Sequence, residues 1–182
     1  MGIFDIFRRK KTLRETVHTV TIDSSQVNEV IRRLGRIDST DYLGKAAVVG
    51  RKAAAAVKSG RYDEAWKHYH TQKELYVKHG NSSEFTPAQI VALDGSVNEQ
   101  LANIRRLEKK HDDALVQFIY SYATSNRVTK SQEKKLPAYV NRAKLQKATM
   151  AEVEAFIQTS SARDLRAIQL RVAAWHPTNE ED

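Results

Sequence analysis

Histidine and carboxylate side chains cluster in the segment 63–74, where their spacing could support metal binding. His68 and His70 are two residues apart, so on a helix they point to different sides and cannot share a metal ion. His70 and Glu74 are four residues apart and could share one. A metal site still needs a third ligand, and the sequence contains no HExxH or similar spacing. We therefore expect no metal and no other cofactor.

Two pairs of carboxylates, Asp63-Glu64 and Asp112-Asp113, are the other candidates for chemistry. Each pair stands at the start of a predicted helix, where negative charge complements the helix dipole, and this explains both pairs without catalysis. The chain has no phosphate-binding glycine loop, no GxSxG nucleophile motif and no cysteine. The sequence therefore predicts a protein that is not an enzyme.

The composition indicates one soluble helical domain. A chain of 182 residues is long enough for a substantial core, and seven Gly and three Pro are too few for an all-β fold with frequent turns. The absence of cysteine excludes disulfides and fits a reducing compartment. No apolar run approaches the length of a membrane span, and the start "MGIFDIFRRKK" has the opposite order to a secretory signal. We expect a cytoplasmic protein.

Residues 1–22 form a separate N-terminal segment and linker. Its first part combines apolar side chains on one side of a short helix with a run of cations: Ile3, Phe4, Phe7, Arg8, Arg9, Lys10 and Lys11. Such a segment could lie in an anionic membrane interface, or it could pack against the protein body or a partner. The β-branched stretch 16–22 has no second strand to pair with, so it is either a linker or an edge that pairs with another chain.

Residues 23–176 form a predicted helical domain, and residues 177–182 form an acidic tail. The helical periodicity and caps predict about eight helices paired as antiparallel hairpins, an all-α fold. The predicted helices cover 24–34, 38–60, 61–80, 86–110, 111–126, the residues after Pro137, 150–158 and 160–175. The helix over 86–110 keeps one apolar phase through Gly95, so one continuous helix is favoured over two, although residues 96–99 could start a second. "VTKSQEKK" (128–135) is a predicted polar connector.

A repeat relates residues 46–79 to residues 95–128. With this offset Ala53 matches Ala102, Asp63-Glu64-Ala65 matches Asp112-Asp113-Ala114, and Tyr69 matches Phe118. Two helices cross closely only where both present small side chains, so we expect Ala53 to meet Ala65 and Ala102 to meet Ala114. The aromatic residue one turn later then fills the space beneath the crossing. Tyr62, Ala65 and Tyr69 are therefore predicted to be structural.

The repeat resembles the tetratricopeptide repeat, whose hairpins carry a small residue, then Gly-x-Tyr, then Ala-x-x-x-aromatic. "GRYDEAWKHY" matches this pattern well, whereas "KKHDDALVQF" has His111 in the tyrosine place and no turn glycine. A third pair, "LPAYVNRAKLQKATMAEVEAFI", keeps only the hairpin rhythm. The tryptophan and Leu-Gly signatures of the first helix and the closing proline are missing. The resemblance implies a right-handed stack of hairpins, or a bundle of similar helices.

The resemblance also implies a concave groove, lined by the first helix of each hairpin, that holds a peptide or a partner helix. The residues in those places, and hence the candidate partner-binding residues, are Ala47, Gly50, Ala54, Lys58, Glu99, Asn103 and Arg106. Some family members grip a C-terminal carboxylate with Lys and Asn early in the first repeat. Gly50 and Ala54 occupy those places here, so that activity is not expected. The small residues could equally favour helix formation and pack on the predicted helix 24–34.

The leading functional hypothesis is a non-enzymatic adaptor that binds a protein or peptide in this groove. A net charge of +8 supports an alternative, a basic regulator associated with nucleic acid. The cations that could contact phosphates are Arg105, Arg106, Lys109, Lys110, Lys130, Lys134, Lys135, Arg142, Lys144 and Lys147. A third hypothesis is a regulatory domain that binds a small ligand between its hairpins.

Overall fold

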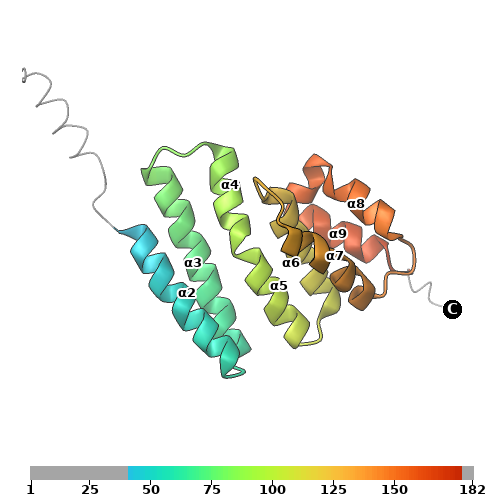
Figure 1. Cartoon of the computed structure of the whole chain (residues 1–182), viewed down its shortest axis with the longest axis horizontal. Helices are drawn as coiled ribbons and strands as arrows, with labels where there is room; N and C mark the ends of the chain where they lie inside the picture. The colour runs from blue at the N-terminus through green and yellow to red at the C-terminus, as the bar shows by residue number, and fades with distance from the viewer. Residues whose placement is uncertain (1–40, 178–182) are drawn as a thin grey trace, which may run out of the picture. The chain divides into compact units, whose positions relative to one another are not determined.

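The computed structural model describes residues 41–177, and all regular structure in that range is helical (Figure 1). The elements are α2 (Tyr42–Lys58), α3 (Tyr62–Ser82), α4 (Pro87–Ser96), α5 (Asn98–Leu107), α6 (His111–Thr124), α7 (Lys130–Ala143), α8 (Met150–Ile157), the 3-10 turn η1 (Ser160–Arg163) and α9 (Leu165–Ala174). Most helices pack on their neighbours in the sequence, beginning with α2 on α3. The all-α prediction is confirmed for these residues. The predicted helix 24–34 and the stretch 16–22 lie outside them.

Small residues occupy the centre of both predicted hairpins. Ala53 of α2 and Ala65 of α3 have no exposed surface and lie in one buried cluster with Tyr69. Ala102 of α5 and Ala114 of α6 are likewise fully buried, in a second cluster that holds Phe118. The helices approach closely at these alanines, and the aromatic ring one turn later fills the adjoining space. As predicted, each pair of alanines is fully buried in a shared cluster between two helices that pack together.

Helix α5 links the two clusters. Its Leu101 and Ile104 are fully buried in the cluster of the first hairpin, whereas its Ala102 belongs to that of the second. The side chains diverge because neighbouring residues on a helix point in different directions. As a result α5 packs on α6 and also contacts α3, which joins the hairpins into one stack.

The turns of the two hairpins have the same hydrogen bonds although their sequences differ. In the first, the Arg61 N–H donates to the Ala56 carbonyl (2.9 Å) and the Gly60 N–H to the Val57 carbonyl (3.0 Å). The second repeats this pattern 49 residues later, from Lys110 to Arg105 (2.9 Å) and from Lys109 to Arg106 (3.1 Å). This is the Schellman motif, which needs a left-handed residue. Gly60 has φ +71° and Lys109 has φ +63°.

Replacing Lys109 with glycine should raise the free energy of unfolding by about 0.5–1 kcal/mol, because glycine adopts the left-handed conformation without the steric cost that lysine bears. Urea unfolding followed by circular dichroism measures the change. Gly60→Ala is the converse control. A Cβ at Gly60 would touch nothing within 4 Å, so the expected loss of about 1 kcal/mol is conformational. A destabilised Lys109→Gly variant would contradict this account of the turn.

The predicted continuous helix over 86–110 is divided at one residue, Val97, which separates α4 from α5. Val97 keeps right-handed backbone angles and is 3% exposed, and Figure 1 shows the chain continuing in nearly the same direction. The apolar phase therefore persists across the break, as the sequence indicates. The capping box at the start of α4 is confirmed, because the Thr86 side chain accepts from the Gln89 N–H and the Gln89 side chain accepts from the Thr86 N–H.

The predicted connector 128–135 is wrong, because α7 already begins at Lys130. Thr129 and Gln132 form a capping box that starts this helix, and the box lies within the polar stretch that favoured a connector. Gln132 and Leu136 are both buried, so the first turns of α7, before Pro137, pack against the rest of the protein. Pro137 therefore lies inside the helix, where it removes one backbone donor, and does not begin it.

The third predicted hairpin also differs from expectation. The main partner of α7 is α6, whereas α8 packs on η1 and more lightly on α6. Helix α9 and the turn η1 also pack on α6, so four later elements contact this one helix. The hydrophobic residues explain this arrangement. The α6 residues Leu115, Phe118 and Ile119 are all fully buried, so α6 is apolar on several sides and accepts several neighbours.

Candidate functional site

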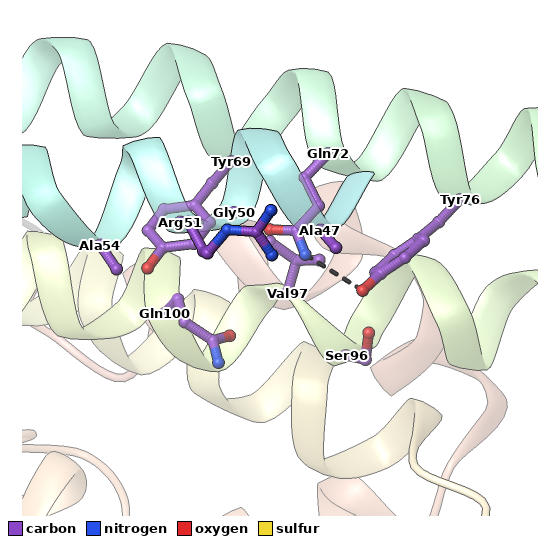
Figure 2. A pocket seen from close by; sticks show the side chains of 10 residues that line it. All are labelled: Ala47, Gly50, Arg51, Ala54, Tyr69, Gln72, Tyr76, Ser96, Val97 and Gln100. Carbon is purple, nitrogen blue, oxygen red and sulfur yellow. Dashed lines mark hydrogen bonds between the residues drawn. The ribbon is translucent and has the colours of Figure 1, made fainter. Parts of the chain in front are cut away.

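A hollow of about 340 Å³ lies where α2, α3 and the α4–α5 junction meet (Figure 2). Its lining residues are Ala47, Gly50, Arg51, Ala54, Tyr69, Gln72, Tyr76, Ser96, Val97 and Gln100. Figure 2 shows Ala47 and Ala54 on one side of the hollow and Ser96 and Gln100 on the other. Three of the predicted partner-binding residues, Ala47, Gly50 and Ala54, therefore lie together in this hollow.

Helix α2 brings these residues together by its periodicity. Ala47, Gly50 and Ala54 are separated by three and four residues, so they share one face, while Ala46 and Ala53 face α3 and are fully buried. The missing side chain at Gly50 lets Gln72 of α3 lie directly against the α2 backbone. A Cβ at Gly50 would come within 3.0 Å of the Gln72 amide. The floor of the hollow is therefore made of small side chains and backbone.

Helix α3 supplies hydroxyl and amide groups to the hollow. The Gln72 amide nitrogen donates to the Tyr76 hydroxyl (3.1 Å), which fixes both side chains on the same face. Tyr69 is mostly buried, and burial raises the pKa of its hydroxyl, which is a hydrogen-bond donor at neutral pH. The hollow thus offers both donors and acceptors over an apolar floor.

The other four predicted residues lie outside the lining of the hollow. Lys58 is the last residue of α2 and is exposed. Glu99 accepts from the Lys135 ammonium of α7 at 2.6 Å. Asn103 Oδ1 accepts two hydrogen bonds from the Arg106 guanidinium, at 2.7 and 3.2 Å. The structure therefore divides the predicted set between the hollow, the C-terminal end of α2 and helix α5.

Sequence reasoning missed Arg51, Gln72, Tyr76 and Gln100 as lining residues. Arg51 follows Gly50 directly, and Gln72 and Tyr76 lie three and seven residues after the buried Tyr69, on the same side of α3. Gln72 and Tyr76 could therefore have been predicted from their spacing, given that Tyr69 lies between the helices. Predicting Gln100 would have required the position of α5 relative to α2, and the 49-residue repeat does not give that position.

Several of the histidines and carboxylates considered for chemistry have structural partners. His70 stacks at an angle against Trp66, with ring centroids 5.0 Å apart, and burial together with the charge of Lys73 lowers its pKa. Glu64 pairs with Arg61 (2.6 Å) and lies 3.5 Å from His68. Within residues 41–177, no three His, Asp or Glu side chains are grouped so that they could hold a metal ion.

A buried polar network between α3, α4 and α6 was not predicted. The Lys73 ammonium lies 3.1 Å from an Asp94 carboxylate oxygen, and that oxygen also accepts from the Tyr120 hydroxyl at 3.0 Å. The ammonium also stands over the Tyr120 ring, 5.5 Å from its centroid. Burial and the Asp94 carboxylate strongly raise the Tyr120 pKa. Each group has a partner, so the network joins three helices and presents no free reactive group.

The N-terminal segment and the tail lie outside the described residues. The proposed tether, Ile3 to Lys11, and the domain limits at residues 22 and 177 therefore stay predictions. Among the helices that the structure describes, none combines the length and apolar character needed to cross a bilayer. Comparison with protein-family models, with curated proteins and with solved structures gives no significant match.

Proposed function

We propose that this chain is a non-enzymatic, tetratricopeptide-like scaffold that binds a segment of a partner protein in the hollow between α2, α3 and α5. The observation that carries the proposal is the composition of that hollow. Ala47, Gly50 and Ala54 leave room for close approach by another chain, and Gln72 and Gln100 offer amide groups beside them. Small residues favour close packing of a helix or strand, and side-chain amides can pair with a peptide backbone.

The two matching hairpins support the same proposal. Their left-handed turns and buried alanines have the same arrangement, so α2 and α5 occupy equivalent places in successive hairpins. Stacked hairpins create an extended surface along their first helices, and such surfaces suit elongated ligands. The hollow lies between those first helices.

A tryptophan that fills the hollow should abolish partner binding without unfolding the protein. Ala54→Trp places a large side chain on an exposed position of the lining, and Ala151→Trp makes the same change on the exposed face of α8. Each variant is used to capture proteins from a lysate, with and without nuclease treatment, and thermal unfolding confirms that both are folded.

We expect the captured partner to be retained by Ala151→Trp and lost from Ala54→Trp. Equal capture by both folded variants would exclude the hollow as the binding site. Capture that disappears for every variant after nuclease treatment would favour the nucleic-acid alternative.

A further inference from the structure

The exposed face of α5 extends the hollow toward α7. Ser96 and Gln100 line the hollow, and Asn103 and Arg106 follow at spacings of three residues, each step turning about 60° around the helix away from the hollow's lining. The rise of an α-helix is about 1.5 Å per residue, so Arg106 lies roughly 9 Å beyond Gln100. An extended peptide covers that distance with about three residues. A segment bound in the hollow can therefore reach Arg106.

Helix α7 carries a second arginine, Arg142, at a position that corresponds to Arg106 on α5. The ion pair between Lys135 and Glu99 connects α7 to α5, and α6 packs on both of these helices. Arg142 follows Lys135 by seven residues, as Arg106 follows Glu99. Arg142 also shares a surface hollow of about 390 Å³ with Lys109 and Lys110, the residues that come directly after α5. The two guanidinium groups therefore lie near the same ends of their helices.

Tyr139 of α7 is influenced by the charges of both arginines. Tyr139 lies one turn before Arg142 on α7, and its ring stacks on Phe118 with centroids 4.4 Å apart. Burial raises the pKa of Tyr139, while the nearby positive charge of Arg106 acts in the opposite direction, as does that of Arg142. Both arginines are thus close enough to Tyr139 to affect its ionisation.

The charge of these arginines is not balanced by the described part of the chain. Arg106 donates to the neutral Asn103 amide, and Arg142 donates to the Ala138 carbonyl at 3.0 Å. Neither forms an ion pair within residues 41–177, and the same holds for Arg51 in the hollow.

The neighbouring carboxylates are mostly engaged elsewhere. Glu99 pairs with Lys135, Glu108 with Arg105 (2.7 Å), and Asp112 lies 3.2 Å from His176. Asp113 shares the surface hollow with Arg142 without forming an ion pair. The face therefore retains more positive than negative charge once these ion pairs are taken into account.

We propose that the partner segment is acidic, and that its carboxylates bind Arg106 and Arg142 while its small or apolar residues lie against α2. This inference rests on the proposed function and specifies the chemistry of the ligand. Arginine binds carboxylates through two parallel hydrogen bonds, which are stronger and more directional than a single one. We define the arginine pair as Arg106 and Arg142.

Hydrogen-bonding groups on this surface favour a peptide over a nucleic acid. Gln72 and Gln100 carry carbonyl acceptors as well as donors, and a peptide backbone supplies N–H groups for those acceptors. The phosphate groups of a nucleic acid supply no such donor, so only its bases or ribose hydroxyls could serve.

Fluorescence anisotropy with three labelled probes tests the proposal on the full-length chain. The first probe is a peptide of about twelve residues built from alanine, leucine and glutamate. The second has glutamine in place of every glutamate, and the third is an oligouridine of similar length. Arg106→Gln/Arg142→Gln is the test variant. Lys67→Gln/Arg166→Gln, at exposed positions of α3 and α9, removes the same charge elsewhere.

We expect the wild type to prefer the glutamate peptide over the glutamine peptide by about ten-fold or more, because hydrogen bonds to charged groups contribute more than neutral ones. The arginine-pair variant should lose that preference, and Lys67→Gln/Arg166→Gln should keep most of it. Equal binding of the two peptides, or an equal loss in both variants, would overturn the inference. Tighter binding of oligouridine than of the glutamate peptide would overturn it in favour of nucleic acid.

The two proposals fail separately. If Ala54→Trp loses its partner while the glutamate and glutamine peptides bind equally, the groove remains and only the acidic ligand is wrong. If the glutamate peptide binds through the arginine pair while Ala54→Trp captures its partner normally, the hollow is not the binding site, and the proposed carboxylate site at the arginine pair still stands.

Discussion

Replacing Ala53 with leucine should lower the free energy of unfolding by about 1–3 kcal/mol, whereas Ala55→Leu, two residues along the same helix, should change it by less than about 0.5 kcal/mol. Ala53 has no exposed surface and lies against the cluster that contains Ala65, Tyr69 and Leu101. Leucine adds three carbon atoms at a close helix crossing, so α2 must move away from α3. Ala55 is exposed, and leucine and alanine both favour helix formation.

Urea unfolding of the two variants measures this difference directly. The comparison removes helix propensity from the result, because both substitutions exchange the same residues near the middle of α2. Equal stability of the two variants would mean that the hairpin is not held by contact between small residues. That outcome would remove the physical basis for aligning the two hairpins as repeats.

The alanine crossings could be predicted from sequence because they depend on local spacing. A small residue, a turn and a second small residue recur after 49 residues, and the structure buries all four alanines. The turn of the second hairpin shows why the two hairpins are more alike in structure than in sequence. Lys109 adopts the left-handed conformation of Gly60, so the backbone motif is kept at an energetic cost that is visible only in the structure.

The contacts between distant helices could not be predicted in this way. Asp94 meets Lys73 and Tyr120 because α4 lies between α3 and α6, and no spacing in the sequence brings these residues together. The same limit explains the third hairpin. The spacing of α7 and α8 in the sequence predicted a third hairpin. Helix α6 is apolar on several sides, however, and the later helices pack on it.

The candidate site was predicted in part for the same reason. Ala47, Gly50 and Ala54 share a face of one helix, so their grouping follows from periodicity. The residues facing them, Gln72 on α3 and Gln100 on α5, belong to the hollow only because of how three helices pack. Periodicity therefore identified one wall of the hollow, and tertiary packing determined the others.

Gly95→Ala should be strongly destabilising, by about 3 kcal/mol, although alanine normally favours a helix over glycine by about 1 kcal/mol. Gly95 is buried in α4 at its contact with α6. A Cβ there would overlap the Thr124 hydroxyl and lie 2.9 Å from the Thr124 Cβ, which is too short for two carbon atoms. Thr124 is itself buried at the end of α6, so it has little room to move.

Gly50→Ala is the matched control, since Gly50 is also a helical glycine beside another helix. Its added Cβ would approach only the end of the Gln72 side chain, at 3.0 Å, and that side chain can rotate away. We expect Gly50→Ala to be neutral or stabilising by up to about 1 kcal/mol. Thermal and urea unfolding of both variants, compared with wild type, measure the difference.

A double variant shows whether the overlap with Thr124 is the cause. Thr124→Ala removes the hydroxyl, whose hydrogen bond to the Tyr120 carbonyl (2.6 Å) lies within α6 itself. In the Gly95→Ala background this second change should recover part of the lost stability, because the Cβ contact remains after the hydroxyl is gone. Strictly additive effects would place the cost of Gly95→Ala elsewhere. Recovery would establish that α4 and α6 are held together by close backbone approach at Gly95, the same principle that the alanines provide within each hairpin.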